Sequence, residues 1–196
     1  LTPMSFVVYA GVFVANMLMI TFGTNLSLVI SRDQIGTVAQ AGTVSSVNTI
    51  FAFVAGMLFF TIKGKARRYT TSLAFGLVGL GIAILYFSYS LPLFYVGAAC
   101  YGFGFGLYNP QLTMVAAQTA AKPVYAPIAI AGYTSCVGIG QFLASLLLPQ
   151  AGKILGLTSN RFEWLIAFVG LGIGVVITAV YITVTGGADG KQQGKK

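Results

Sequence analysis

The sequence predicts an all-α integral membrane protein in which six transmembrane helices form two three-helix inverted repeats. Three observations predict this fold class. The 196-residue chain is 57% hydrophobic and only 7% charged, whereas a soluble domain carries roughly 25% charged residues. Six apolar stretches are long enough to cross a bilayer core, which takes about 20 residues in a helix. Short motifs of the first half also recur, in the same order, in the second half.

The recurring motifs are separated by nearly constant spacings. Val-Gly-Leu-Gly-Ile occupies residues 78–82 and again 169–173. Ala-Gly-x-x-Ser-x-Val occupies residues 41–47 and again 131–137. Chance is the alternative, because glycine, alanine, valine and leucine dominate any membrane helix. The constant spacing favours an internal repeat of three-helix units.

The first repeat is expected over about residues 5–89. Its three spans cover residues 5–30, 38–62 and 70–89, and short polar loops separate them. These spans are too long for buried strands, and they lack strand alternation. Because lipid offers no hydrogen bonds to the backbone, the segments have to be helices.

The second repeat is expected over about residues 91–185. Its three spans cover residues 91–118, 125–149 and 162–185. Three alternating glycines within residues 102–106 indicate either close helix packing or a flexible helix that lines a cavity.

The two repeats together make a six-helix transmembrane bundle of residues 1–185. Residues 186–196 are polar and rich in glycine, and we expect them to be a disordered cytoplasmic tail. Most of the 11 basic residues follow the second, fourth and sixth spans, while Arg32, Lys153 and Arg161 lie on the other side. The positive-inside rule therefore predicts a multi-pass protein of the cell (plasma or inner) membrane with both termini in the cytoplasm.

The composition argues against enzymatic and nucleic-acid-binding functions. The chain has no histidine, and Cys100 and Cys136 lack CxxC spacing, so we expect no metal site and no cofactor. The acidic residues lie in loops, at helix ends or in the tail, so catalytic groups are missing from the membrane interior. The net charge of +8 comes from residues between spans, which indicates membrane topology and contact with lipid.

The segment that follows the second span resembles a known signature. In the major facilitator superfamily, this loop of each half reads Gly-x-Leu-x-Asp-Arg-x-Gly-Arg-Arg. The chain has Phe60 in place of the aspartate and is one residue longer, which favours the C-terminal half and puts in doubt a gating salt bridge from that aspartate. The resemblance implies a cytoplasmic gating and topology loop that includes Gly56, Gly64, Lys65, Arg67 and Arg68.

Two further segments resemble the C-terminal half of such a transporter. Residues 102–110 look like its fourth helix, and residues 140–145 look like its fifth helix in drug/proton antiporter-like members. The resemblance implies a missing N-terminal half of six helices. No span carries a titratable group at its centre, so any proton coupling is expected to run through that missing half.

Polar side chains inside the spans are the candidates for a substrate cavity. They are costly in lipid and usually face a bundle interior or water, although a hydrogen bond between helices is the alternative for each. The resemblance implies that the first, second, fourth and fifth helices of the half line the cavity. The candidates are Asn16, Asn48, Tyr108, Asn109, Gln111, Tyr133 and Gln141.

These observations predict transmembrane transport of a small solute by alternating access. Because the candidates carry no charge, we expect neutral, amphipathic or cationic solutes, and we favour efflux of drug-like or amphipathic compounds. Uptake of a sugar or metabolite is the alternative. A different class, namely a non-transporting membrane scaffold or a six-helix half-transporter that acts as a homodimer, also stays open.

Overall fold

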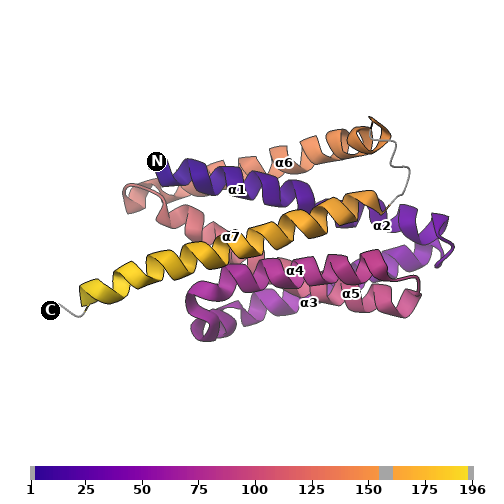
Figure 1. The fold of residues 1–196 in the computed structure, drawn as a ribbon, viewed down its shortest axis with the longest axis horizontal. Coiled ribbons are helices and arrows are strands. Elements are labelled where there is room, and N and C mark those ends of the chain that lie inside the picture. Colours follow the sequence, from indigo (N-terminus) through magenta and orange to yellow (C-terminus); the bar gives the residue numbers. More distant parts are fainter. Residues whose placement is uncertain (1–2, 155–160, 194–196) are drawn as a thin grey trace.

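The structure, a computed structural model, describes residues 3–154 and 161–193, and all of its regular elements there are helices (Figure 1). In chain order they are α1 (Pro3–Met19), α2 (Thr21–Arg32), α3 (Val38–Ala66), the 3-10 helix η1 (Arg67–Tyr69), α4 (Thr70–Phe87), α5 (Leu91–Gln118), the 3-10 helix η2 (Pro123–Tyr125), α6 (Ala126–Ile154) and α7 (Phe162–Gln193).

Six helical spans are long and apolar enough to cross a membrane within the described ranges, and α1 and α2 together count as the first of them. This confirms the predicted all-helical membrane fold. The start of α3 shows how the sequence sets a helix end. Thr37 caps it, because the Gln40 backbone N–H donates to the Thr37 hydroxyl at 3.3 Å while the Thr37 N–H donates to Gln40 Oε1 at 2.8 Å.

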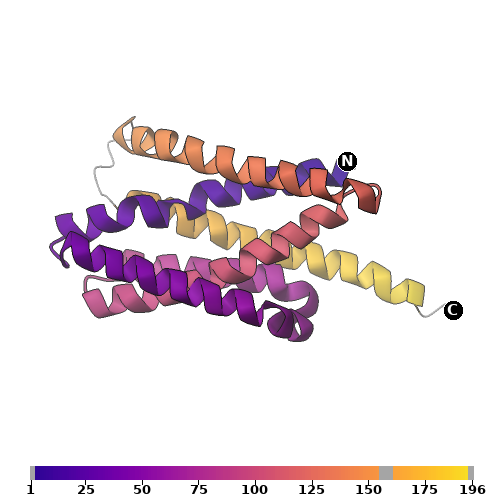
Figure 2. The ribbon, with the colours of Figure 1, turned by 180° about the vertical axis from the view of Figure 1, so that it is seen from behind.

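The helices pack in a pattern that relates the two halves of the chain. α1 lies beside α6, and α3 and α4 both pack on α5 (Figures 1 and 2). α7 runs between these two groups and contacts α4 and α1. Exchanging the first three spans for the last three turns α1–α6 into α3–α5 and α1–α7 into α4–α5, while α4–α7 maps onto itself. The start of α1 and the end of α7 lie at the same end of the bundle (Figure 1).

The glycines of α5 allow its neighbours to approach closely. A Cβ atom at Gly104 would lie 2.6 Å from the backbone nitrogen of Val78 on α4. A Cβ at Gly102 would clash with the carbonyl oxygen of Asn48 on α3, and one at Gly106 would clash with that of Ala52. The glycine-rich motif therefore serves close helix packing, which was the first of its two interpretations.

Several predicted boundaries differ from the structure. The second span continues to Ala66 and the fifth to Ile154, past their expected ends at residues 62 and 149. The last continues to Gln193, so residues 186–193 extend a helix where a disordered tail was expected. Adding a residue to an existing helix needs no new nucleus, which offsets part of the cost of the three glycines in this segment. Residues 194–196 lie outside the described residues.

Candidate functional site

The first membrane span is locally distorted, but not severed, at Ile20, which keeps helical dihedrals (φ −62°, ψ −23°), donates to the carbonyl oxygen of Asn16 at 3.1 Å and accepts from the Thr24 N–H at 3.2 Å. α1 ends at Met19 and α2 begins at Thr21, although neither proline nor glycine stands at the junction. The Thr21 hydroxyl donates a 2.7 Å hydrogen bond to the carbonyl oxygen of Leu18. Bonds of this kind from threonine to a preceding carbonyl bend helices.

Two distant side chains bind the backbone at this break. The hydroxyl of Tyr101, on α5, donates to the carbonyl oxygen of Met19 at 2.7 Å. The indole Nε1 of Trp164, on α7, donates to the carbonyl oxygen of Thr21 at 2.9 Å. A carbonyl left without a partner is expensive in lipid, so these two bonds stabilise the distorted span.

A pocket of about 140 Å³ lies beside the break. We call it the break pocket. It draws residues from α1, α2, α3, α5 and α6, and none from α4 or α7. Its lining is Met19, Ile20, Phe22, Gly23, Asn48, Tyr101, Phe105 and Gln141.

Two of the predicted cavity residues, Asn48 and Gln141, meet in the break pocket. The Asn48 Oδ1 atom is buried without a hydrogen-bond partner and lies against Gly102. Neither carboxamide makes a hydrogen bond to another residue in the part of the chain that the structure describes. Both carboxamides are therefore uncommitted, although they come from different helices.

Aromatic rings form the other wall of the break pocket. The rings of Phe22 and Tyr101 stack with centroids 4.4 Å apart and 15° between their planes. Tyr101 and Phe105 follow at 6.0 Å and 14°, and Phe105 and Tyr108 at 6.4 Å and 18°. The result is a row of nearly parallel rings along one face of α5.

The other predicted cavity residues lie outside the break pocket and bond across helices. Asn16 Nδ2 donates to the hydroxyl of Tyr108 at 3.0 Å, which joins α1 to α5. The hydroxyl of Tyr133 donates to Asn109 Oδ1 at 3.4 Å, which joins α6 to α5. Asn16 Oδ1 is nevertheless buried without a partner. In this conformation, the two hydrogen bonds connect α1 and α6 to α5.

Gln111 points toward α4. Its Nε2 donates to the hydroxyl of Thr71 at 3.3 Å, and its Oε1 is buried without a partner. Gln111 therefore forms a hydrogen bond between helices, which was the alternative to a cavity-lining role for each candidate.

The predicted gating loop is partly helical. Gly56 lies inside α3, and Gly64 and Lys65 belong to its last turns, because α3 continues to Ala66. Arg67 follows with a positive φ of 49° and turns the chain into η1. Basic residues at a helix C-terminus interact favourably with its dipole. The side chain of Arg68 lies outside the described residues.

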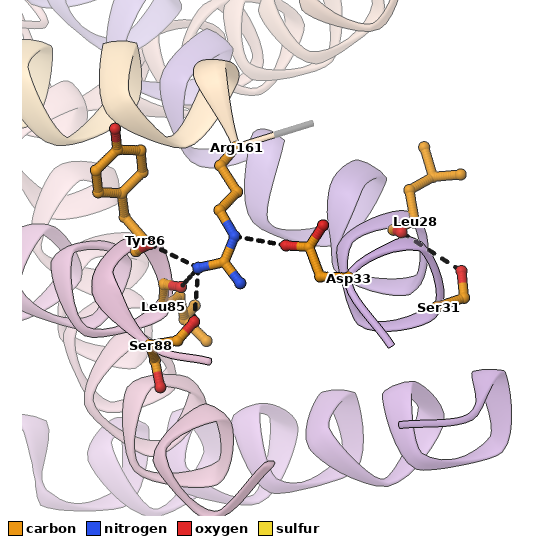
Figure 3. Close-up of polar contacts among 7 residues, drawn as sticks. All are labelled: Leu28, Ser31, Asp33, Leu85, Tyr86, Ser88 and Arg161. Carbon is orange, nitrogen blue, oxygen red and sulfur yellow. Dashed lines mark hydrogen bonds and ion pairs between the residues drawn. The ribbon is translucent and has the colours of Figure 1, made fainter. Parts of the chain in front are cut away.

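At the opposite end of the bundle, one arginine binds three helix ends (Figure 3). Arg161 Nε donates to Asp33 Oδ2 at 2.7 Å, and Nη1 donates to the carbonyl oxygens of Leu85, Tyr86 and Ser88 at 3.2, 2.6 and 2.6 Å. The arginine is only 5% exposed. We call this arrangement the Arg161 clamp. It ties the end of α2 and the end of α4 to the start of α7.

A second polar contact reinforces the clamp. Asn25 Nδ2, on α2, donates to Glu163 Oε2, in the first turn of α7, at 2.7 Å. A carboxylate is favourable at a helix N-terminus because it offsets the positive end of the helix dipole.

The seven-residue spacing of Tyr101 and Tyr108 predicts that both rings lie on one face of their helix, but sequence reasoning missed Phe22, Phe105 and the clamp. Phe105 lies between the two tyrosines at four- and three-residue spacing, and that helical spacing could have revealed it. The pairing of Asp33 with Arg161 had no local signal, because it depends on how α2 and α7 pack.

The fold and the pocket define a multi-pass membrane protein whose uncommitted polar groups face a small space between helices. No cluster of His, Cys, Asp or Glu suited to a metal ion occurs among the described residues. The family model of the Major Facilitator Superfamily matches residues 1–196, and the chain belongs to this superfamily. Its members carry out transmembrane transport and are transporters, not enzymes. No curated protein matches the sequence.

Proposed function

We propose that this chain supplies one half of a solute pathway in a secondary active transporter. The pathway opens to one side of the membrane at a time, by alternating access. The six spans act as the C-terminal half, and a further six-helix half supplies the opposite wall. The protein resides in the cell (plasma or inner) membrane with both termini in the cytoplasm, as the distribution of its basic residues favours.

The observation that carries the proposal is the meeting of Asn48 and Gln141 beside the helix break. An uncommitted carboxamide inside a membrane protein costs free energy unless water or a solute satisfies it. Helices that line solute sites in transporters are frequently irregular, and the first span is locally distorted beside these two carboxamides.

The lining of the break pocket favours an uncharged, amphipathic or cationic solute. It includes no aspartate, glutamate, lysine or arginine. Solutes with several negative charges usually require arginine or lysine partners. We therefore favour efflux of drug-like or amphipathic compounds.

Proton coupling, if the transporter uses it, runs through the other half. Asp33 pairs with Arg161, and Glu163 accepts a hydrogen bond from Asn25. Both carboxylates lie at one end of the bundle, away from the centres of the spans. The side chain of Asp189 lies outside the described residues.

Sugar or metabolite uptake is the second candidate. The paired carboxamides of Asn48 and Gln141 favour it, because amides hydrogen-bond readily to hydroxyl groups.

A transport assay tests the proposal. The full-length protein, reconstituted in liposomes, is given a fluorescent amphipathic cation or a labelled hexose under an imposed proton gradient. We expect Gln141→Ala and Asn48→Ala to lower transport of one of the two solutes at unchanged membrane insertion. Gln150→Ala is the matched control, because Gln150 is an exposed glutamine on the same helix as Gln141 and lies outside the break pocket.

Each outcome of this assay has a clear reading. Wild-type transport by both variants would remove these residues from the site. Transport of neither solute by the wild-type protein would reject the proposed solute classes. Cross-linking of two copies at a shared cavity would replace the two-half arrangement with a homodimer.

A further inference from the structure

We infer that the break pocket binds one flat, uncharged aromatic ring that carries a carboxamide-like hydrogen-bonding edge. This inference rests on the proposed function, and it names the chemical class of the group that the pathway recognises. It follows from the size of the pocket, the stacking of its rings and the positions of its two amides.

The volume of the pocket matches a single ring. It measures about 140 Å³. A protein cavity of about 150 Å³ with an apolar lining binds benzene. A larger solute can therefore place one ring in the break pocket while the rest of it extends toward the other half.

The lining favours an aromatic ring over a saturated one. Phe22 and Tyr101 already stack at 4.4 Å, and Phe105 continues the row. The hydroxyl of Tyr101 is occupied by the Met19 carbonyl and Tyr101 is only 4% exposed, so the half-buried Phe105 offers the accessible ring of this wall. Aromatic groups gain from stacked or edge contacts with such rings beyond the burial of their area.

The two carboxamides specify the edge of the ring. Because Asn48 Oδ1 is buried against Gly102, the amide nitrogen is the polar side-chain atom of Asn48 that a ligand can reach. This amide nitrogen is a donor, so the ligand has to provide an acceptor. Gln141 offers both a donor and an acceptor. A carboxamide or lactam edge supplies the matching groups, and no charged residue of the lining requires an ion.

A hexose fits this arrangement less well. Its hydroxyl groups surround the whole ring, and each one loses free energy when it is buried without a partner. The pocket offers two carboxamides and is otherwise mostly apolar.

Ligand-observed saturation-transfer NMR tests the inference. The probes are benzamide, cyclohexanecarboxamide and benzoate, each titrated against the full-length protein in lipid nanodiscs. We expect saturable binding of benzamide. Cyclohexanecarboxamide lacks the aromatic face and benzoate carries a charge, so each should bind at least about tenfold more weakly, the equivalent of one lost favourable contact. Equal binding of benzamide and cyclohexanecarboxamide would overturn the inference.

Two variants locate the binding. Gly23 lines the pocket, and a Cβ atom there would meet nothing within 4 Å, so Gly23→Leu is chosen to add bulk at the pocket lining. It should abolish benzamide binding. The matched control is Gly172→Leu on α7. A Cβ atom at Gly172 also meets nothing within 4 Å, and Gly172 does not line the pocket. Gln141→Leu should weaken binding about tenfold at similar side-chain volume.

The variants also separate this inference from the proposed function. Unchanged benzamide binding by folded Gly23→Leu would place the ring elsewhere and overturn the inference. If Gly23→Leu fails to fold, Gln141→Leu decides, because unchanged binding by that variant would overturn it equally. Transport without benzamide binding would overturn the ring site alone. Benzamide binding without transport of any solute would support the ring site and reject the proposed function.

Discussion

The hydroxyl of Tyr101 donates a 2.7 Å hydrogen bond to the carbonyl oxygen of Met19, the last residue of α1. Residues from the two halves of the chain therefore meet at the distortion of the first span. The same tyrosine stacks on Phe22, the second residue of α2. One side chain thus contacts both sides of the break, through a polar tip on one side and a ring face on the other.

Tyr101→Phe should destabilise the protein while preserving the stacked ring. The change leaves the Met19 carbonyl without its buried partner, which costs about 1–3 kcal/mol of unfolding free energy. The measurement is thermal unfolding in nanodiscs. Tyr95→Phe is the control, because the hydroxyl of Tyr95 bonds to Thr43 at an exposed position. Equal losses in the two variants would mean that the bond at the break has no special role.

Arg161→Met should lower stability strongly, because it leaves Asp33 and three backbone carbonyls without their shared partner. Asp33 is exposed to solvent, so the loss comes mainly from the buried carbonyl oxygens left without a donor, which costs about 1–3 kcal/mol. Arg161→Lys should recover only part of the loss, since a compact ammonium group cannot span the same set of acceptors.

The control for the clamp is Lys122→Met, which removes an exposed cation from a loop and should change stability by less than about 0.5 kcal/mol. Thermal unfolding in the same nanodiscs measures all three variants. Full recovery by Arg161→Lys would show that charge alone, and not the geometry of the guanidinium, holds the three helix ends.

Gly104→Ala should separate α5 from α4. The added Cβ would lie 2.6 Å from the Val78 backbone nitrogen, and overpacking of this kind costs about 1–3 kcal/mol. Gly76→Ala, on α4, is the matched control because its Cβ would meet nothing within 4 Å. Retained thermal stability in Gly104→Ala would contradict the close packing that we describe.

Replacement of Lys63, Lys65, Arg67 and Arg68 by glutamine should disturb the orientation of the protein. These residues carry half of the positive charge that the positive-inside rule uses on that side. Accessibility of labelled termini in intact cells measures the outcome. An unchanged location of both termini would count against the predicted topology.

The sequence was sufficient to predict the six spans because each consists of a long apolar run between short polar loops. The loop after α3 was also visible, since its basic residues follow the run at once. The break at Ile20 could not be predicted, because no proline or glycine stands at that residue. Its hydrogen bonds come from Tyr101 and Trp164, far away along the chain.

The polar residues of the candidate site were predicted from the sequence, but its phenylalanines were not. Asn48 and Gln141 stood out as polar residues in apolar spans, whereas Phe22 and Phe105 resembled any other membrane-embedded phenylalanine. Their role depends on stacking between helices, which periodicity alone does not show. Arg161 and Asp33 could be assigned to one side of the membrane, but their pairing depends on the packing of α7 against α2.

The Arg161 clamp connects α2, α4 and α7 at one end of the bundle and leaves α1 and α6 outside this connection. Because one guanidinium holds the ends of α2, α4 and α7, these helices have to move as one body at that end of the bundle. α1 lies beyond Ile20 and is free of the clamp, and its main neighbour is α6. A movement of α1 and α6 about Ile20 would therefore leave the hydrogen bonds of Arg161 to Asp33, Leu85, Tyr86 and Ser88 in place.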